Sequence, residues 1–205
     1  MHPSVYGVGY LGEYPYKVTY ITDESKKKNV PEYEVWLGML KRCYAEKSAA
    51  FPRYGGKGVT VCREWHNFQR FSEWYSIQPN AAAKYDLDKD LLDGKGIVYS
   101  PETCSLIPNA VNSLFSGGRV DGVTYNKAKR KWVVQIQQGE LSAAGSKKQT
   151  YYGAFESKAE AQEVAINAKV DHVLSVAEKY KDCMDEGVYR NLSDVLFIKT
   201  LLGVS

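Results

Sequence analysis

The chain has 205 residues and a net charge of +3, with 44% hydrophobic and 25% charged residues. This composition is typical of a folded globular protein and excludes wholesale disorder. No stretch approaches the roughly 20 consecutive apolar residues of a membrane helix, and the first residues lack the charged head and apolar run of a secretory signal. We therefore expect a cytoplasmic protein of one or two domains without membrane contact.

The four cysteines are Cys43, Cys62, Cys104 and Cys183. No two of them have the close spacing of a zinc ribbon or a redox motif, so we expect reduced, mostly buried thiols. A zinc cluster of Cys43, Cys62 and Cys104, with or without His66, is an alternative that this spacing disfavours.

The positive charge is concentrated in one segment. Residues 119–153 hold seven Lys and Arg against two Asp and Glu. Such a local excess indicates a polyanion partner. The alternative is a solvated lysine face, the commoner meaning of a run of charge.

Residues 1–30 are expected to form an extension, with a short strand around 16–20 and a basic loop at 25–29. Pro31 suits the first turn of a helix whose buried stripe would include Trp36 and Cys43. The glycine-rich segment 52–58 lacks the spacing of a phosphate loop and predicts a tight turn. The aromatic residues that follow have helical spacing, which indicates core packing.

Residues 85–108 predict a short acidic strand, a Gly-Lys-Gly turn and a second strand, followed by a short helix over 109–118. Asp86, Asp88 and Asp90 alternate along the first strand, so they would share one side of it. They would either anchor Mg²⁺ through oxygen ligands or form a solvated acidic strand end.

Residues 119–181 predict three strands and one long helix. The strands are expected at 122–125, 132–136 and 150–155, with a basic turn and a long loop at 137–149 between them. Ser157 and Glu160 form a capping box that begins a helix ending near Tyr180. By alternation, Trp132 faces the core or an edge and Gln135 faces solvent.

The first part of the chain resembles a known family. Four motifs occur in order over about residues 33–115: W-x-x-M-x-x-R-C-Y (36–44), Y-G-G-K-G-V-T-V-C-x-E-W (54–65), L-D-K-D (87–90) and Y-S-P-E-T-C (99–104). Together they resemble the HNH-type homing endonucleases of bacteriophages. That resemblance implies a ββα unit that binds one divalent metal, Mg²⁺ or Mn²⁺, and hydrolyses DNA.

The second part resembles another family. The motifs G-V-T-Y-N-K-x-x-x-K-W-V-V-x-I and Y-Y-G-A-F-x-S-x-x-E-A, over about residues 120–170, are similar to the APETALA/ethylene-response DNA-binding domain. The resemblance implies a three-stranded sheet packed on one helix and a double-stranded DNA partner. The two families occur together in phage endonucleases.

The expected fold class is therefore α+β, a degenerate HNH-like ββα-metal domain followed by a three-stranded antiparallel sheet packed on one helix. The expected boundaries are 1–30 for an N-terminal extension, 31–118 for the nuclease-like domain, 119–181 for the DNA-binding domain and 182–205 for a C-terminal helical tail. The sequence does not predict the oligomeric state.

The nuclease resemblance implies site residues and also departs from the family pattern. Asp88, Asp90 and Thr103 would hold the metal, with Thr103 where the family has asparagine. Lys89 stands where the family has its histidine base. Lysine is a poor base near neutral pH because its amine is almost entirely protonated there, and flanking aspartates favour its charged form. The remaining candidate catalytic residues are Asn112 (or Asn109), for the later asparagine, and His66, as a substitute base.

On the expected sheet, basic residues would neutralise DNA phosphates and outward-facing side chains would contact bases or sugars. The candidate DNA-binding residues are Arg119, Lys127, Lys129, Arg130, Lys131, Trp132, Gln135, Lys147, Lys148 and Tyr151.

Three hypotheses follow. The first is a DNA-binding HNH-type endonuclease with metal-dependent cleavage. The second is a nuclease-derived DNA-binding regulator without activity, favoured by Lys89 and Thr103. The third is a phage protein-interaction module that sequesters a host protein, which residues 119–153 disfavour.

Overall fold

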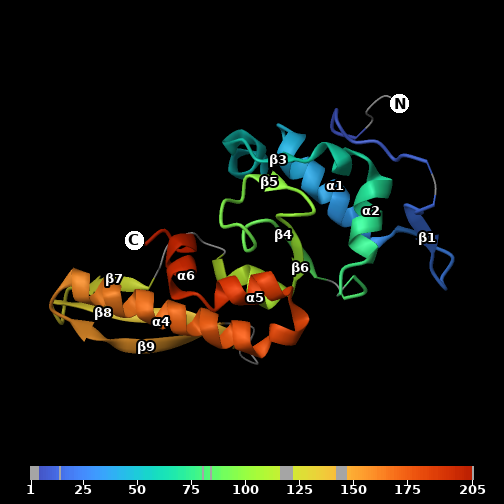
Figure 1. Cartoon of the computed structure of the whole chain (residues 1–205). Coiled ribbons are helices and arrows are strands. Elements are labelled where there is room, and N and C mark those ends of the chain that lie inside the picture. Colours follow the sequence, from blue (N-terminus) through green and yellow to red (C-terminus); the bar gives the residue numbers. More distant parts are fainter. Residues whose placement is uncertain are drawn as a thin grey trace. The chain divides into compact units, whose positions relative to one another are not determined.

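In a computed structural model (Figure 1), the described residues are 5–13, 15–79, 81–83, 85–115, 122–141 and 147–204, with backbone only at 137–141 and 147–148. The chain divides into two compact units. The first unit comprises residues 1–112 with 182–188, and the second comprises 113–181 with 189–205. Both units mix helices with small sheets, so the expected α+β class is confirmed.

The strands of the first unit are two or three residues long: β1 (Thr19–Ile21), β2 (Lys27–Asn29), β3 (Thr60–Val61), β4 (Asp86–Asp88), β5 (Val98–Tyr99) and β6 (Ser105–Ile107). Its α-helices are α1 (Pro31–Tyr44), α2 (Phe68–Ser76) and α3 (Asn109–Asn112). Single 3₁₀ turns lie at Phe51–Arg53, Gly55–Lys57 and Arg63–His66.

Helix α1 begins and ends as its sequence predicts. Pro31 occupies the first turn, where its missing N–H costs no hydrogen bond. Acidic residues lie in the first turn and basic residues in the last, which suits the helix dipole. Trp36 and Leu40 are fully buried, together with Met39, on the face that carries the core.

Aromatic residues from α1, α2 and the turn between β3 and α2 form the core of the first unit. The Trp36 indole Nε1 donates a 2.6 Å hydrogen bond to the Trp65 carbonyl oxygen. Trp65 in turn contacts Phe71 edge to face, with ring centroids 5.1 Å apart. The predicted core role of these aromatic residues is confirmed. Val8, Val18 and neighbouring side chains also pack against this core, so the described part of residues 1–30 belongs to the first unit.

Three two-stranded sheets complete the first unit. β1 pairs with β2 and β4 pairs with β6, both antiparallel, whereas β3 pairs with β5 in parallel. Helix α3 follows β6 directly and packs on β4. The predicted basic loop at 25–29 is wrong in part, because residues 27–29 form strand β2.

The second unit contains the sheet β7 (Val123–Asn126), β8 (Lys131–Leu141) and β9 (Lys147–Phe155), all antiparallel in that order. Its long helix is α4 (Lys158–Lys179), and α6 (Val195–Leu201) packs against α4. Two elements cross the boundary between the units, a 3₁₀ turn at Lys181–Cys183 and helix α5 (Glu186–Leu192).

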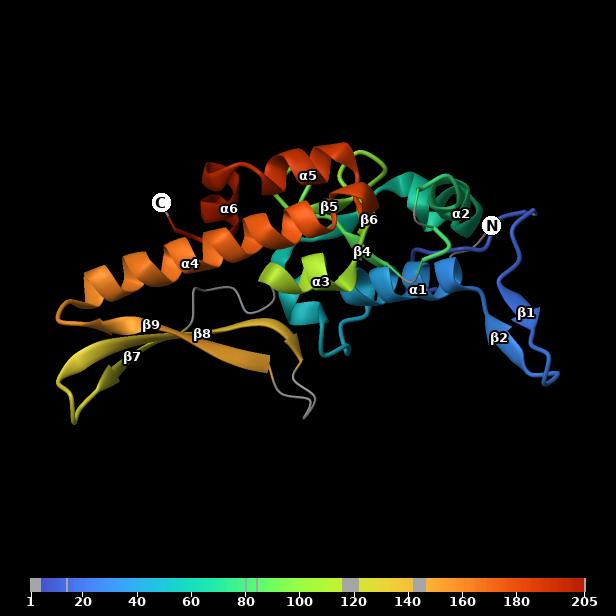
Figure 2. The same cartoon turned by 90° about the horizontal axis from the view of Figure 1, so that it is seen from below.

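Helix α4 covers one face of this sheet (Figure 2). Val134 and Ile136 of β8 pack against Ala161 and Ala165 of α4, whose small side chains let helix and sheet approach closely. Ser157 caps α4 by accepting hydrogen bonds from the backbone of Ala159 and Glu160, as the capping box predicts. The three strands and one helix expected from the sequence are confirmed.

The predicted loop at 137–149 is shorter than expected, since β8 continues to Leu141 and β9 begins at Lys147. Strands β8 and β9 shift in register between Val134 and Gln135, and beyond this shift Gln137 pairs with Gln149. Strand pairing therefore extends into a stretch whose glycine, serine and lysine content is typical of a loop.

Within the part of the chain that the structure describes, no helix is long and apolar enough to cross a membrane. None of the four cysteines forms a disulfide, as expected. Cys43 and Cys104 are buried, whereas Cys62 and Cys183 are partly exposed, so the expected burial is confirmed for two of the four.

Candidate functional site

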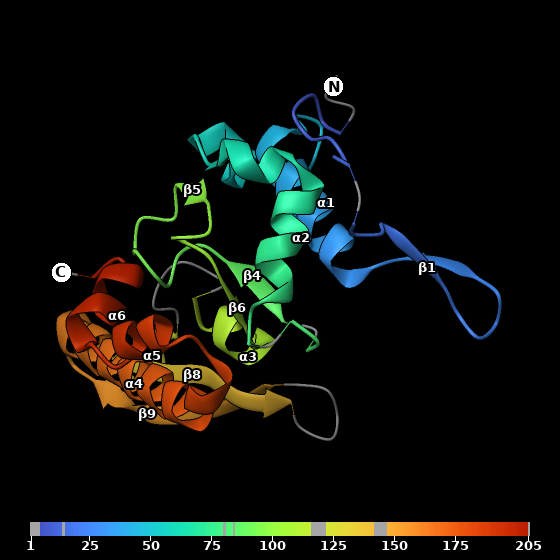
Figure 3. The same cartoon turned by 45° about the vertical axis from the view of Figure 1, so that its right-hand side comes forward.

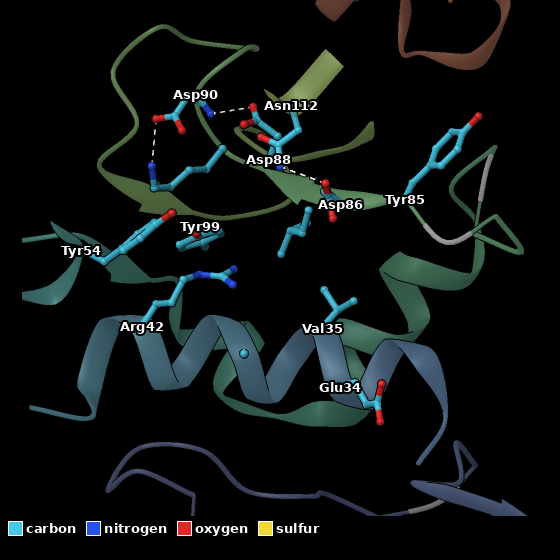
Figure 4. Close-up of a pocket in the computed structure, with 13 residues that line it drawn as sticks. Glu34, Val35, Arg42, Tyr54, Tyr85, Asp86, Asp88, Asp90, Tyr99 and Asn112 are labelled. Atoms are coloured by element: carbon cyan, nitrogen blue, oxygen red, sulfur yellow. Dashed lines mark hydrogen bonds and ion pairs between the residues drawn. The ribbon is translucent and has the colours of Figure 1, made fainter. Parts of the chain in front are cut away.

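The first unit contains a cavity of about 200 Å³ beside β4 (Figure 4). Its walls come from α1, β4 and the turn that follows, β5 and α3. Most side chains that line it are polar or charged, among them Glu34, Arg42, Tyr54, Asp86, Asp88, Lys89, Asp90, Tyr99 and Asn112. Five residues predicted as candidates for a site therefore share one cavity, namely Asp86, Asp88, Lys89, Asp90 and Asn112.

Asp88 is the most deeply placed carboxylate of this cavity, with 9% of the residue exposed. Its Oδ1 accepts hydrogen bonds from the backbone N–H groups of Asp90 and Leu91, at 2.9 and 2.8 Å. Burial raises the pKa of Asp88 to about 6, and the neighbouring Asp90 adds to the rise. The hydrogen bonds from the two backbone N–H groups lower the pKa, but they offset only part of this rise.

Asp86, two residues earlier on β4, is held by helix α3. Its Oδ2 accepts hydrogen bonds from Nδ2 of Asn109 at 2.9 Å and of Asn112 at 3.1 Å. The asparagines therefore fix a carboxylate on the strand. Asp90 lies beyond the end of β4, so the predicted single strand face for all three aspartates is wrong for Asp90.

Two basic side chains contact the same two tyrosine rings in this cavity. Lys89 Nζ is 5.4 Å from the centre of the Tyr54 ring and 5.6 Å from that of Tyr99. The Arg42 guanidinium carbon is 5.5 and 5.6 Å from the same two ring centres. Figure 4 shows Arg42 reaching from α1 toward both rings. Such cation–π contacts are attractive and hold both side chains against the rings.

Lys89 also forms an ion pair with Asp90. Its Nζ donates to Asp90 Oδ1 at 2.8 Å, and only 7% of the Lys89 side chain is exposed. Gly96, with φ of +61°, lies against this pair, and a Cβ atom there would collide with Asp90 Oδ1. The predicted Gly-Lys-Gly turn thus leaves room for the ion pair.

Arg42, Tyr54 and Tyr99 also line the cavity, although they are not among the residues predicted for the site. Each lies in one of the motifs that carry the nuclease resemblance, which was the available signal. Neither α1 periodicity nor the glycine-rich turn predicts that their side chains converge, because they come from three separate segments.

Two predicted site residues do not line this cavity. His66 ends the turn before α2, where its Nε2 lies 3.4 Å from the Tyr44 hydroxyl and burial lowers its pKa. The Thr103 hydroxyl donates to the Val98 carbonyl oxygen at 2.6 Å. Both side chains therefore have local structural contacts.

The oxygen ligands of the cavity suit a hard divalent cation. The described residues contain no group of three or more His, Cys, Asp or Glu side chains placed to hold a metal. Cys43, Cys62 and Cys104 are therefore not gathered into the zinc cluster considered as an alternative. Mg²⁺ commonly uses only one or two carboxylates and keeps several waters. Asp88 and Asp90 therefore fit such an ion by donor type and charge.

In the second unit, the sheet face opposite α4 carries polar and aromatic side chains. Gln135 on β8 is exposed and pairs with Tyr151 on β9, whose exposure is 56%. Thr124 and Val133 form another directly opposed pair on this face. We call Thr124, Val133, Gln135 and Tyr151 the outer face. The predicted outward orientation of Gln135 is confirmed.

Trp132 belongs to the other side of the sheet. It packs with the core under α4 and contacts Tyr125, with ring centroids 5.1 Å apart. The Lys158 ammonium lies 5.4 Å from the centre of the Trp132 ring. Its predicted core-facing orientation is confirmed, and it is not part of the outer face.

Basic residues gather at the turn that joins β7 to β8. Lys127, Lys129 and Arg130 are exposed, and the Lys129 N–H donates to Asn126 Oδ1 at 3.0 Å. Lys131, at the start of β8, forms an ion pair with Glu156 at 3.0 Å. Arg119 lies outside the described residues, as do the side chains of Lys147 and Lys148.

Scans against protein-family models, curated proteins and solved structures each found no match for this chain.

Proposed function

We propose that this protein binds double-stranded DNA through the outer face and the adjoining basic turn, Lys127–Arg130. The observation that carries the proposal is a sheet that α4 covers on one side only, with Gln135 and Tyr151 exposed on the other. A β-sheet can place such side chains against base edges in the major groove. The exposed lysine and arginine side chains at the turn would neutralise phosphates.

For the first unit we propose an HNH-like site that hydrolyses phosphodiesters with Mg²⁺ or Mn²⁺. The antiparallel pair β4–β6 followed by α3 supports a ββα arrangement, with Asp88 at the end of the first strand. Asp88 and Asp90 would hold the metal, which would stabilise negative charge on the phosphate and the leaving oxygen. Arg42 would place a positive charge beside the bound phosphate, and the Asn109 and Asn112 amides hold Asp86 on the strand.

One specific observation favours a second candidate function, a DNA-binding regulator without nuclease activity. By the family resemblance Lys89 takes the position of the general base, yet its Nζ is buried, ion-paired with Asp90 and in contact with two tyrosine rings. A nitrogen engaged in this way as a hydrogen-bond donor to a carboxylate is not placed to accept a proton from water. The described residues that line the cavity include no histidine to replace it.

Incubation of the protein with supercoiled plasmid at low salt tests both functions. Mobility and nicking would be scored with Mg²⁺, Mn²⁺ or EDTA, for the wild type, Asp88→Asn and Glu46→Gln. Glu46 is an exposed carboxylate outside the cavity, so its variant controls for loss of one negative charge. Metal-dependent nicking lost only in Asp88→Asn supports the nuclease.

A mobility shift without nicking under either metal supports the regulator. Absence of any shift at low salt contradicts DNA binding and leaves the protein-interaction module as the better hypothesis.

A further inference from the structure

Residues 18–30 form a ribbon that extends from the first unit (Figures 2 and 3). Its strands β1 and β2 pair in register, with Tyr20 opposite Lys28 and Ile21 opposite Lys27. At its base, the Val30 N–H donates to the Val18 carbonyl oxygen at 3.0 Å. Both valines pack against the core of the first unit, so the ribbon is anchored at one end.

The tip of the ribbon has a defined turn. The Thr22 N–H donates to the Lys26 carbonyl oxygen at 2.9 Å, and the Ser25 N–H donates to the Thr22 carbonyl oxygen at 2.8 Å. Ser25 has a φ of +58°, the left-handed conformation expected at the end of a three-residue hairpin loop. Hydrogen bonds rather than apolar packing therefore hold the tip.

The two strands have almost no core of their own. All strand residues except Thr19 are exposed, and Tyr20 and Ile21 expose 47% and 65% of their surfaces. An isolated two-stranded hairpin is marginally stable in water. The ribbon is therefore held by its ladder of hydrogen bonds and its anchored base, and both of its faces are open to a partner.

The charge of the ribbon indicates which partner. Lys26, Lys27 and Lys28 are consecutive, and Lys26 forms an ion pair with Glu24 at 2.7 Å. Among the described residues, no ion pair involves Lys27 or Lys28. Neighbouring residues of a strand point to opposite faces. One face of the ribbon therefore presents Lys28 beside Tyr20, and the other presents Lys27 beside Ile21.

We propose that this ribbon is a second DNA contact, in which Lys27 and Lys28 bind phosphates and Tyr20 and Ile21 pack against sugars. The inference rests on the proposed DNA binding. A two-stranded ribbon fits within the major groove, where phosphates flank it on both sides. An acidic protein is a poorer match, because two exposed apolar side chains form far less than the roughly 800 Å² per partner of a stable protein interface.

The test compares three double variants with the wild type: Lys27→Ala/Lys28→Ala, Lys129→Ala/Arg130→Ala, and Lys41→Ala/Lys47→Ala as the control. Lys41 and Lys47 are exposed and lie outside both proposed surfaces. Affinity for a labelled duplex of about 30 base pairs would be measured by fluorescence anisotropy across a salt series, after thermal unfolding shows that each variant folds.

Because each neutralised phosphate contributes about 0.9 to the slope of log K against log salt, the ribbon variant is expected to lower that slope by about 2. Tyr20→Ser is expected to weaken binding without changing the slope. An unchanged slope and affinity in the ribbon variant, with a reduced slope in the Lys129/Arg130 variant, overturns the ribbon contact and leaves the proposed function standing. An equal fall in the control also overturns it, and no binding by the wild type overturns both.

Discussion

The Lys89 ammonium donates to Asp90 Oδ1 at 2.8 Å, and the two members of this ion pair differ in exposure. The Lys89 side chain is 7% exposed and that of Asp90 is 49% exposed. The lysine of this pair is therefore buried, whereas its carboxylate partner is half exposed. Substitution of Lys89 and substitution of Asp90 are expected to change the stability of the fold differently.

Asp90→Asn is expected to destabilise the fold by about 1 kcal/mol, because it leaves a buried ammonium group with a weaker acceptor while solvent screens part of the loss. Lys89→Met is expected to be neutral or stabilising, since an apolar chain of similar length can pack against Tyr54 and Tyr99 and no ammonium group is then buried. Urea denaturation of both variants measures the difference. Equal destabilisation by the two substitutions would contradict the asymmetry.

Gly96→Ala is expected to cost more stability than Gly58→Ala. Both glycines have positive φ, so each substitution carries a backbone cost of about 1–2 kcal/mol. At Gly58 nothing lies within 4 Å of an added Cβ, whereas at Gly96 that atom collides with Asp90 Oδ1. Thermal unfolding of the pair separates the backbone cost from displacement of Asp90, and matching melting temperatures would contradict the crowding at Gly96.

Asp88→Asn is expected to stabilise the fold at neutral pH by on the order of 3 kcal/mol. The pKa of Asp88 is about 6 in the fold against 3.8 for the unperturbed group. Between these two pH values Asp88 is mostly protonated in the folded chain and mostly ionised in the unfolded chain. The free energy of unfolding of the wild type therefore falls as pH rises from about 4 to 6, and above that range the cost of the buried carboxylate stays constant. Asparagine avoids the penalty and still accepts the two backbone N–H groups.

Urea denaturation of the wild type and Asp88→Asn at several pH values between 4 and 8 measures this effect. The advantage of the variant should vanish near pH 4 and reach a plateau above pH 6. A difference that does not depend on pH would contradict the burial of an ionisable Asp88.

Arg130→Gly is expected to raise stability and weaken DNA binding at once. Arg130 has a φ of +50°, a conformation that glycine adopts without the strain of a side chain, so the gain is up to about 1 kcal/mol. Lys129→Gly removes the same charge without that gain. Both variants should lose similar affinity in the salt titration, and only Arg130→Gly should melt at a higher temperature.

The sequence predicted local elements well where a single pattern decides them. Pro31, the buried stripe around Trp36 and the Ser157 cap each involve neighbours along the chain, and their elements are confirmed. The alternation of Trp132 and Gln135 likewise assigned the two faces of β8.

Features that depend on distant segments were harder to predict. β2 is a run of polar residues whose strand conformation comes from pairing with β1, and the ends of β8 and β9 pair in the same way. The cavity joins Arg42, Tyr54 and Tyr99 to the aspartates of β4, which no spacing rule connects. Tertiary packing decides such positions, because local propensity is weak in each of these segments.

Contact between the outer face and DNA can be observed in the backbone amide NMR spectrum when an unlabelled duplex of about 20 base pairs is added. Binding through this face shifts the amide signals of Lys129, Gln135 and Tyr151, and these shifts disappear as salt is raised. The signals of Gln162 and Glu163, on the exposed side of α4, stay unchanged. Shifts confined to α4, or none at low salt, would contradict binding through the outer face.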